Sequence, residues 1–136
     1  MLRTDLTLAD LKARQAGTLP DQFGLEVTEL QEGELVAAIT VAPWMLAPNG
    51  FLHAASVVML ADTACGYATI AHLPPTAKSF TTIELKSNFM GTARQGRIRA
   101  VATAEHLGRS TQIWSATVYD QQDKKIALFR CTQMML

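Results

Sequence analysis

The chain has 136 residues, 49% of them hydrophobic, and its twelve basic side chains balance twelve acidic ones. This length and apolar content suit one domain, residues 1–136, with a core of its own. The balanced charge, with no long run of either sign, argues against a nucleic acid or an anionic membrane as a partner.

Cysteine usage and the N-terminus bear on the compartment. Only Cys65 and Cys131 occur, far apart and in no C-x-x-C pair, which argues against a disulfide framework or a zinc site. Cys65 could be a nucleophile, but among Ala, Gly and Tyr a small core residue is the better interpretation. The N-terminus carries Asp5 and Asp10 and lacks the continuous apolar stretch of a secretory signal. We therefore expect a cytoplasmic protein without a metal site.

The first predicted element is a short amphipathic helix. Thr7 followed three residues later by Asp10 resembles a capping box, in which each side chain accepts a hydrogen bond from the other residue's backbone N–H. The helix is expected to run to about Gln15, and Gly17 and Pro20 are expected to end it.

Period-two alternation of apolar and polar residues, which is typical of strands, covers most of the remaining chain. A hairpin is predicted around the turn at 31–33, and further strands are predicted at 79–90, 97–106, 111–119 and 125–134. The polar breaks between the last four are plausible reversals in an antiparallel sheet. In the strand at 97–106, one face is formed by the small or aliphatic residues Ile98, Ala100, Ala102 and Ala104.

The apolar segment from Ala54 to about His72 is the predicted central helix, ended by Leu73-Pro74-Pro75. Its length is close to the usual membrane-span threshold of about 18 residues, but its wealth of Ala, Ser, Thr and Gly favours a buried core helix. A helix that is apolar on every side needs a sheet curved around it. The predicted fold class is therefore α+β, with one curved antiparallel sheet wrapped around a long central helix.

Asp62 is the one carboxylate within this apolar segment. A charge there costs several kcal/mol unless it is paired or hydrogen-bonded. Asp62 therefore has either a structural partner, such as Thr63 or a neighbouring strand, or a function.

The start of the predicted helix is a second candidate site. Gly50 allows a sharp turn into it, and the first-turn N–H groups around Ala54 and Ala55 have no partner within the helix. Free N–H donors and the helix dipole suit an anion or a developing oxyanion. The alternative is that His53 only caps the helix and the two alanines only pack.

Asp62 lies eight residues beyond Ala54, so on one helix the two residues are about 12 Å apart along the axis. One carbonyl group cannot contact both. If both act on the same substrate, the carboxylate must come from a second subunit whose central helix runs antiparallel to the first. A two-fold dimer provides this arrangement and makes two equivalent sites.

The stretch "NGFLHAASVVMLADTACGYA" resembles the signature of hotdog-fold acyl-CoA thioesterases of the phenylacetate-degradation and 4-hydroxybenzoyl-CoA type. That signature is written G-x-x-H-G-G followed by Leu-Ala-Asp/Glu, and Gly50, His53 and Asp62 fall at its positions. Downstream, "FTTIELKSNFMGTARQGRIRA" resembles the family's Thr-x-Glu-Leu strand and basic turn, and "HLGRSTQIWSATVYD" resembles its next hairpin. The likeness extends from about Phe23 to the C-terminus.

The resemblance implies a hotdog-fold homodimer or homotetramer with shared active sites and an aryl- or medium-chain acyl-CoA substrate across the subunit interface. Carried over to this chain, Asp62 is the nucleophile or general base and the N–H of Ala54 polarises the thioester carbonyl. His53 positions the loop, and Thr82 helps to place water. No cofactor is implied, because coenzyme A is part of the substrate.

Other positions are expected to bind the substrate. The turn Gly108-Arg109-Ser110 offers a guanidinium, a hydroxyl and backbone N–H groups to the anionic CoA, and Arg94 lies in another turn; the alternative is that these arginines serve solubility. The depth of the acyl pocket is expected to depend on how the dimer closes over Met45, Val57, Met59 and Tyr67. Trp44 and Met45 lie in the loop before the site and could line this pocket, but core packing is the better interpretation for them. The acyl group itself stays undefined.

Two departures from the family pattern are visible. Ala54 and Ala55 replace paired glycines, which narrows the approach to the helix start. Ala47 stands where relatives usually carry Gln or Asn, and Asn49 is the nearest amide that could take over. These departures support a second hypothesis, a non-catalytic acyl-CoA-binding hotdog protein. A third, a hotdog dehydratase, is less well matched by the loop "APNGFLH".

Overall fold

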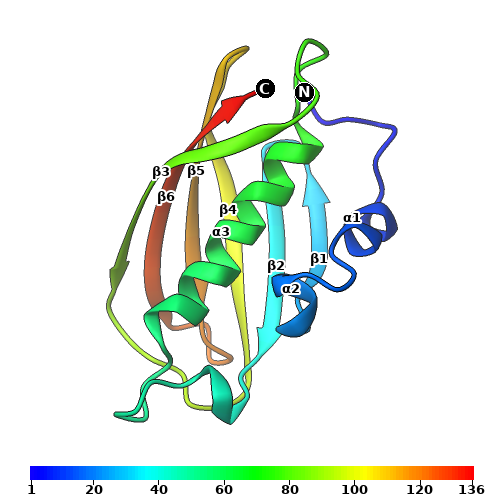
Figure 1. The fold of residues 1–136 in the computed structure, drawn as a ribbon. Helices are drawn as coiled ribbons and strands as arrows, with labels where there is room; N and C mark the ends of the chain where they lie inside the picture. Colours follow the sequence, from blue (N-terminus) through cyan, green and yellow to red (C-terminus); the bar gives the residue numbers. More distant parts are fainter.

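Six antiparallel strands curve around one long helix in the computed structural model, which describes residues 1–136 (Figure 1). The helices are α1 (Leu8–Arg14), α2 (Leu19–Gln22) and α3 (Ala54–Ala71), with a 3-10 turn, η1, at Pro43–Met45. The strands are β1 (Glu26–Gln31), β2 (Glu34–Thr40), β3 (Phe80–Phe89), β4 (Arg97–Leu107), β5 (Thr111–Tyr119) and β6 (Lys125–Met135). The predicted α+β arrangement is confirmed.

The strand order is β1-β2-β4-β5-β6-β3, so β3 is an edge strand that pairs with β6 alone. The predicted reversal after β3 occurs, since β3 and β4 run in opposite directions. It does not form a hairpin, because β6 and β5 lie between the two strands and the connection passes below the start of α3 (Figure 1). Alternation identifies a strand but not its neighbour.

Small residues line both sides of the contact between α3 and the sheet. The inner face of β4 is as predicted, with Ile98, Ala100 and Ala102 buried and Ala104 partly buried. The other alanines of this contact are fully or almost fully buried: Ala37, Ala61, Ala64, Ala68, Ala71, Ala116 and Ala127. Short side chains let the helix lie close to the strands, which fixes its position.

By length and composition α3 would also qualify as a membrane span, yet 67% of it is buried within the fold. The expected core helix therefore accounts for its apolar character. Cys65 and Cys131 are likewise buried and unpaired by a disulfide, in agreement with a packing role for Cys65.

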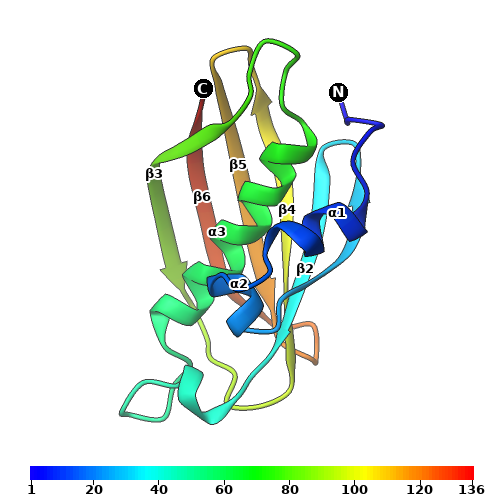
Figure 2. The same cartoon turned by 45° about the vertical axis from the view of Figure 1, so that its right-hand side comes forward.

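The N-terminal helices lie on the same side of the sheet as α3 and cover its β1–β2 end (Figure 2). The capping box of α1 is confirmed: Thr7 Oγ1 accepts from Asp10 N at 3.2 Å, and Asp10 Oδ2 accepts from Thr7 N at 2.8 Å. Pro20 does not merely terminate α1, because it occupies the first turn of the unpredicted helix α2. Proline is tolerated there, since its missing N–H has no partner in the helix.

His72 joins the end of α3 to the sheet through a buried polar network. Its Nε2 accepts from Gly33 N at 3.0 Å, so the ring proton is on Nδ1 and is donated to Ala68 O at 2.7 Å. Gln112 Nε2 donates to His72 O at 2.7 Å, and Trp114 Nε1 donates to Gln112 Oε1 at 2.9 Å. Burial lowers the pKa of His72, so the folded protein holds this histidine neutral.

Acidification below about pH 6.5, the ordinary pKa of histidine, should therefore destabilise the protein. Between about pH 6.5 and the lowered pKa of His72, the unfolded chain binds a proton at this histidine and the folded chain does not. The free energy of unfolding is therefore highest above about pH 6.5 and falls as the pH drops toward that lowered pKa. Urea unfolding at pH 7.5, 6.5 and 5.5 measures the slope. His72→Gln should be less stable at pH 7.5 but show a flatter slope. An equally steep slope in that variant would assign the effect to another group.

Candidate active site

The chain enters α3 through a short hairpin, residues 46–52, which we call the site hairpin. Ala47 N donates to Phe51 O at 2.7 Å, and Gly50 N donates to Ala47 O at 2.9 Å. Gly50 has a φ of 84°, a left-handed conformation that favours glycine, so the predicted sharp turn is confirmed. Asn49 Oδ1 accepts from Phe51 N at 3.1 Å, which leaves the amide NH₂ of Asn49 as its free end.

The connection between β3 and β4 holds this hairpin in place. Thr92 Oγ1 accepts from Leu52 N at 2.9 Å. Arg94 Nε donates to Gly50 O at 3.1 Å, and its guanidinium lies 5.1 Å from the centroid of the Phe51 ring. The structure therefore brings Arg94, one of the predicted substrate-binding residues, to the rim of the helix start.

The first turn of α3 presents one free N–H donor. His53 is the N-cap, and its Nδ1 accepts from Ala55 N at 2.9 Å, so the capping role considered as the alternative for His53 is present. The N–H of Ala54 has no acceptor within the protein, and Ala54 is exposed. This N–H lies at the positive end of an 18-residue helix dipole.

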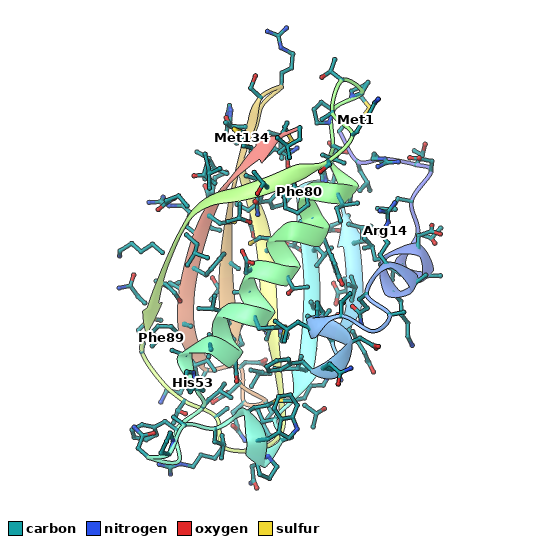
Figure 3. All side chains as sticks on the ribbon, viewed as in Figure 1. Met1, Arg14, His53, Phe80, Phe89 and Met134 are labelled. Carbon is teal, nitrogen blue, oxygen red and sulfur yellow. The ribbon has the colours of Figure 1, made fainter.

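A pocket of about 460 Å³ opens at this helix start. Most of its wall is apolar, and its polar groups are the amide of Asn49 and the hydroxyl of Thr92. The residues that line it are Ala47, Asn49, Phe51, Leu52, Ala54, Val57, Phe89, Gly91 and Thr92. The pocket joins the site hairpin, α3 and the end of β3, and Figure 3 shows His53 and Phe89 at the same end of the molecule.

Of the residues expected around the acyl group, Val57 alone lines this pocket. Met45, Met59 and Tyr67 are buried in the core instead, and the Tyr67 hydroxyl donates to a glutamine of the segment after α1. Trp44 is 60% exposed and packs edge-on against Phe23. The sequence could not show which face of α3 the rest of the fold covers, and Met59 and Tyr67 lie on the covered face.

Asp62 lies half-buried on α3, and its Oδ1 is buried with no hydrogen-bond partner. The partner considered from the sequence is not used, since the Thr63 hydroxyl contacts Met59 Sδ at 3.7 Å. Burial raises the pKa of Asp62. No compensating contact explains why the helix carries this carboxylate.

Asp62 and Thr82 lie on adjacent parts of α3 and β3. One turn beyond Asp62, a Cβ added at Gly66 would lie 3.3 Å from Phe80 Cζ, so the two elements are in contact there. The two elements run in opposite directions (Figure 3). Stepping back from Gly66 to Asp62 covers about 6 Å of helix, and stepping from Phe80 to Thr82 covers about 7 Å of strand. Asp62 and Thr82 therefore lie at similar distances from this contact, on adjacent parts of α3 and β3.

The Thr82 hydroxyl donates to Gln133 Oε1 at 2.7 Å. Gln133 belongs to β6 and is fully buried. Sequence reasoning did not select it, although a glutamine on the inward-facing side of an alternating strand is a signal that could have found it.

A family model described as the thioesterase superfamily matches residues 49–127, which include the helix start, Asp62 and Thr82. The chain belongs to this superfamily. Membership makes it a thioester hydrolase, and the fold of one curved sheet around a central helix is the hotdog fold.

Individual relatives agree with this assignment. The proofreading thioesterase EntH of Cronobacter turicensis is 29% identical and aligns over 96% of this chain and 95% of its own length. The 1,4-dihydroxy-2-naphthoyl-CoA hydrolase of Listeria monocytogenes is 29% identical over 84% of this chain and 92% of its own. The crystal structure of a mutant thioesterase PA1618 from Pseudomonas aeruginosa has a TM-score of 0.93 at 27% identity, covering 99% of this chain and 97% of that one.

The other predicted CoA-binding residues of this thioesterase lie far from Arg94 in the same chain. Gly108, Arg109 and Ser110 form the β4–β5 turn, whose backbone is joined to the end of β6 by a bond from Met135 N to Ser110 O at 2.9 Å. This turn is near the C-terminal end of α3, whereas Arg94 is near its N-terminal end (Figure 1). One chain does not bring the two groups together.

Replacing Ala54 by proline tests the free N–H. Proline fits the first helical position, and His53, with a ψ of 137°, already has the conformation that a following proline requires. If this N–H polarises the thioester carbonyl, Ala54→Pro should lower kcat for thioester hydrolysis about 10²- to 10³-fold with little change in Tm.

Ala54→Gly is the matched control, because it keeps the N–H and removes only the methyl group. It should retain kcat to within a few-fold. Equal activity of the proline and glycine variants would rule out the Ala54 N–H as an oxyanion donor.

Proposed function

We propose that this thioesterase hydrolyses an aryl- or medium-chain acyl-CoA to the free acid and CoA, at sites shared by two subunits. The observation that carries the proposal is the unpartnered carboxylate of Asp62. A buried polar group without a partner costs about 1–3 kcal/mol. A hydrolase retains such a group where it acts on substrate, and the raised pKa of Asp62 suits a base or nucleophile.

The pocket beside Ala54 supports the choice of acyl group. Its volume of about 460 Å³ falls in the usual range for small-molecule sites. The rings of Phe51 and Phe89 and the side chain of Val57 make walls suited to an aromatic ring or a short aliphatic chain. A relative named for an aryl-CoA substrate, the 1,4-dihydroxy-2-naphthoyl-CoA hydrolase, points in the same direction.

The edge strand β3 supports a homodimer. Its outer backbone edge is unpaired, and it exposes large apolar side chains: Ile83 is 55% exposed, Leu85 43% and Phe89 47%. Leu85 and Phe89 stand opposite buried residues of β6, so they project to the helix side of the sheet. An exposed apolar edge of ten residues is a template for pairing with another strand. We propose that β3 of a second copy pairs here about a two-fold axis.

The position of that two-fold axis agrees with the positions of Ala54 and Asp62 on α3. If Asp62 of one subunit faces Ala54 of the other, the axis passes level with the residue midway between them, Val58. The central pair of the β3–β6 ladder is at Leu85. Because of the bulge, it is four ladder steps, or about 13 Å, from the pair at Phe80. On α3, Val58 is about 12 Å from Gly66, the residue that touches Phe80. Symmetric pairing of β3 would therefore place Asp62 and Ala54 of different subunits opposite each other.

In this arrangement the Ala54 N–H polarises the thioester carbonyl, and Asp62 of the partner subunit either activates water or attacks the carbonyl carbon itself. The carbon–sulfur bond then breaks, and its electron pair leaves with the sulfur as the thiolate of CoA. His53 holds the helix start, and Asn49 supplies the nearest side-chain amide. A thioester suits these groups because the thiolate leaves without strong acid assistance.

The two-fold axis also joins the proposed CoA contacts. Antiparallel helices bring the Gly108-Arg109-Ser110 turn of one subunit to the end of the other that carries Arg94. We propose that both arginines bind the CoA phosphates. No cofactor or metal ion has a role in this proposal, and assembly into tetramers is open. We expect the enzyme to work in the cytoplasm, where Cys65 and Cys131 stay reduced.

Asp62→Asn is the direct test of the carboxylate. Turnover of a panel of acyl-CoAs, followed through the released thiol with a thiol-reactive dye, should fall at least about 100-fold. Because burial raises the pKa of Asp62, wild-type kcat/KM should decline on acidification with a midpoint above the ordinary Asp value of about 3.9. Asp62→Glu, which keeps a carboxylate, is the control and should retain measurable activity. Undiminished turnover by Asp62→Asn would reject the assignment.

Shared sites can be tested by combining two inactive variants. A heterodimer of an Asp62→Asn chain and an Ala54→Pro chain, isolated through two different affinity tags, contains one site with both groups intact. It should recover about half of the wild-type activity per dimer. If Asp62 and Ala54 act within one chain, every site carries a mutation and the heterodimer stays inactive.

A further inference from the structure

A buried amide lies directly behind Thr82. Gln133 is 0% exposed, stands opposite Thr82 in the β3–β6 ladder and accepts its hydroxyl proton at 2.7 Å. The Nε2 of Gln133 donates to Cys131 Sγ at 3.4 Å, which fixes the amide with its oxygen toward Thr82. Immediately after Thr82 the register of β3 shifts at an irregularity of the β-bulge type. Bulges next to active sites commonly re-aim side chains.

This hydrogen bond decides what Thr82 can offer to a ligand. A threonine hydroxyl has one proton, and a glutamine carbonyl oxygen can only accept. Since the proton is given to Gln133, Thr82 presents lone pairs on its exposed side. Asp62 receives no proton from Thr82, in agreement with the unpartnered Oδ1 of that carboxylate. Asp62 and Thr82 are therefore two acceptors on adjacent parts of α3 and β3.

We propose that Gln133 is a positioning residue that holds Thr82 as an acceptor, so that Thr82 and Asp62 bind the hydrolytic water through its two protons. A lone pair of that water is then free to attack the thioester carbon. As the new carbon–oxygen bond forms, the water proton that is hydrogen-bonded to Asp62 passes to the Asp62 carboxylate. The thiolate later leaves with the electron pair of the carbon–sulfur bond. The inference rests on the proposed function and selects the water route over direct attack by Asp62.

The chain contains a matched control for a purely structural amide. Gln112 on β5 is 1% exposed and stands opposite Gln133 in the β5–β6 ladder. Its amide bonds to the His72 carbonyl and to the Trp114 indole, and it has no contact with Thr82. Loss of Gln112 therefore removes a buried amide of the same kind without touching the proposed water site.

The test compares Gln133→Met with Gln112→Met. Both variants should have a lower Tm than the wild type. Gln133→Met should also lower kcat about 10- to 100-fold with little change in KM, because the Thr82 hydroxyl is free to turn its proton toward Asp62. Gln112→Met should keep wild-type kcat. Gln133→Glu, which restores an oxygen acceptor, should recover kcat to within about threefold of the wild type.

Variants of Thr82 complete the test. Thr82 is exposed, so its substitution should leave the fold intact. Thr82→Val should lower kcat as much as Gln133→Met, Thr82→Ser should retain it, and the double variant Thr82→Val with Gln133→Met should be no slower than Thr82→Val alone. Wild-type kcat in Thr82→Val or Gln133→Met, or a further loss in the double variant, overturns the inference.

The proposed function has a separate criterion. If the wild type releases no thiol from any acyl-CoA, or if Asp62→Asn is fully active, the proposed function fails and the inference falls with it. If Asp62→Asn is inactive while Gln133→Met keeps wild-type kcat, the inference alone is wrong.

Discussion

Contact between alanines is the constraint on which the rest of this structure depends. The curved sheet approaches α3 closely because both surfaces carry methyl groups where most cores carry longer side chains. Inserting larger side chains into such a contact costs about 1–3 kcal/mol and displaces the backbone. Here a displacement of α3 would also move Asp62 relative to β3. The tight packing thus both stabilises the fold and fixes the position of Asp62 relative to the sheet.

A helix held in this way has two places where polar chemistry reaches its surface. One is the free N–H at its start, and the other is the carboxylate of Asp62, about 12 Å further along the axis. A rigid helix cannot bend to bring them to one carbonyl, so the proposed reaction requires one group from each of two subunits. The apolar edge strand β3 would then provide the subunit contact and, through Thr82, a part of the site.

The two buried glutamines, Gln112 and Gln133, have different kinds of hydrogen-bond partner in the same sheet. Gln112 ties the end of α3 to the strands through His72, and all its contacts lie inside the core. Gln133, its neighbour across the ladder, contacts a residue on the exposed edge strand. The difference lies in their partners, since both are equally inaccessible. On the proposal above, the exposed partner is what would give Gln133 a part in function.

The sequence by itself determined most of the helices and strands and singled out the carboxylate of Asp62. Caps, alternation and an apolar run are local patterns, and a charge such as Asp62 within that run is conspicuous without coordinates; the likeness to the thioesterases then supplied the site's outline. Only the tertiary structure decided that β3 pairs with β6 and that Gln133 lies behind Thr82. It also decided that Arg94 binds the site hairpin at one end of α3 while Arg109 lies at the other end. These contacts join residues 38 or more positions apart, and they depend on strand register and on a bulge. Local pattern does not encode either, because register is chosen by packing across the whole sheet.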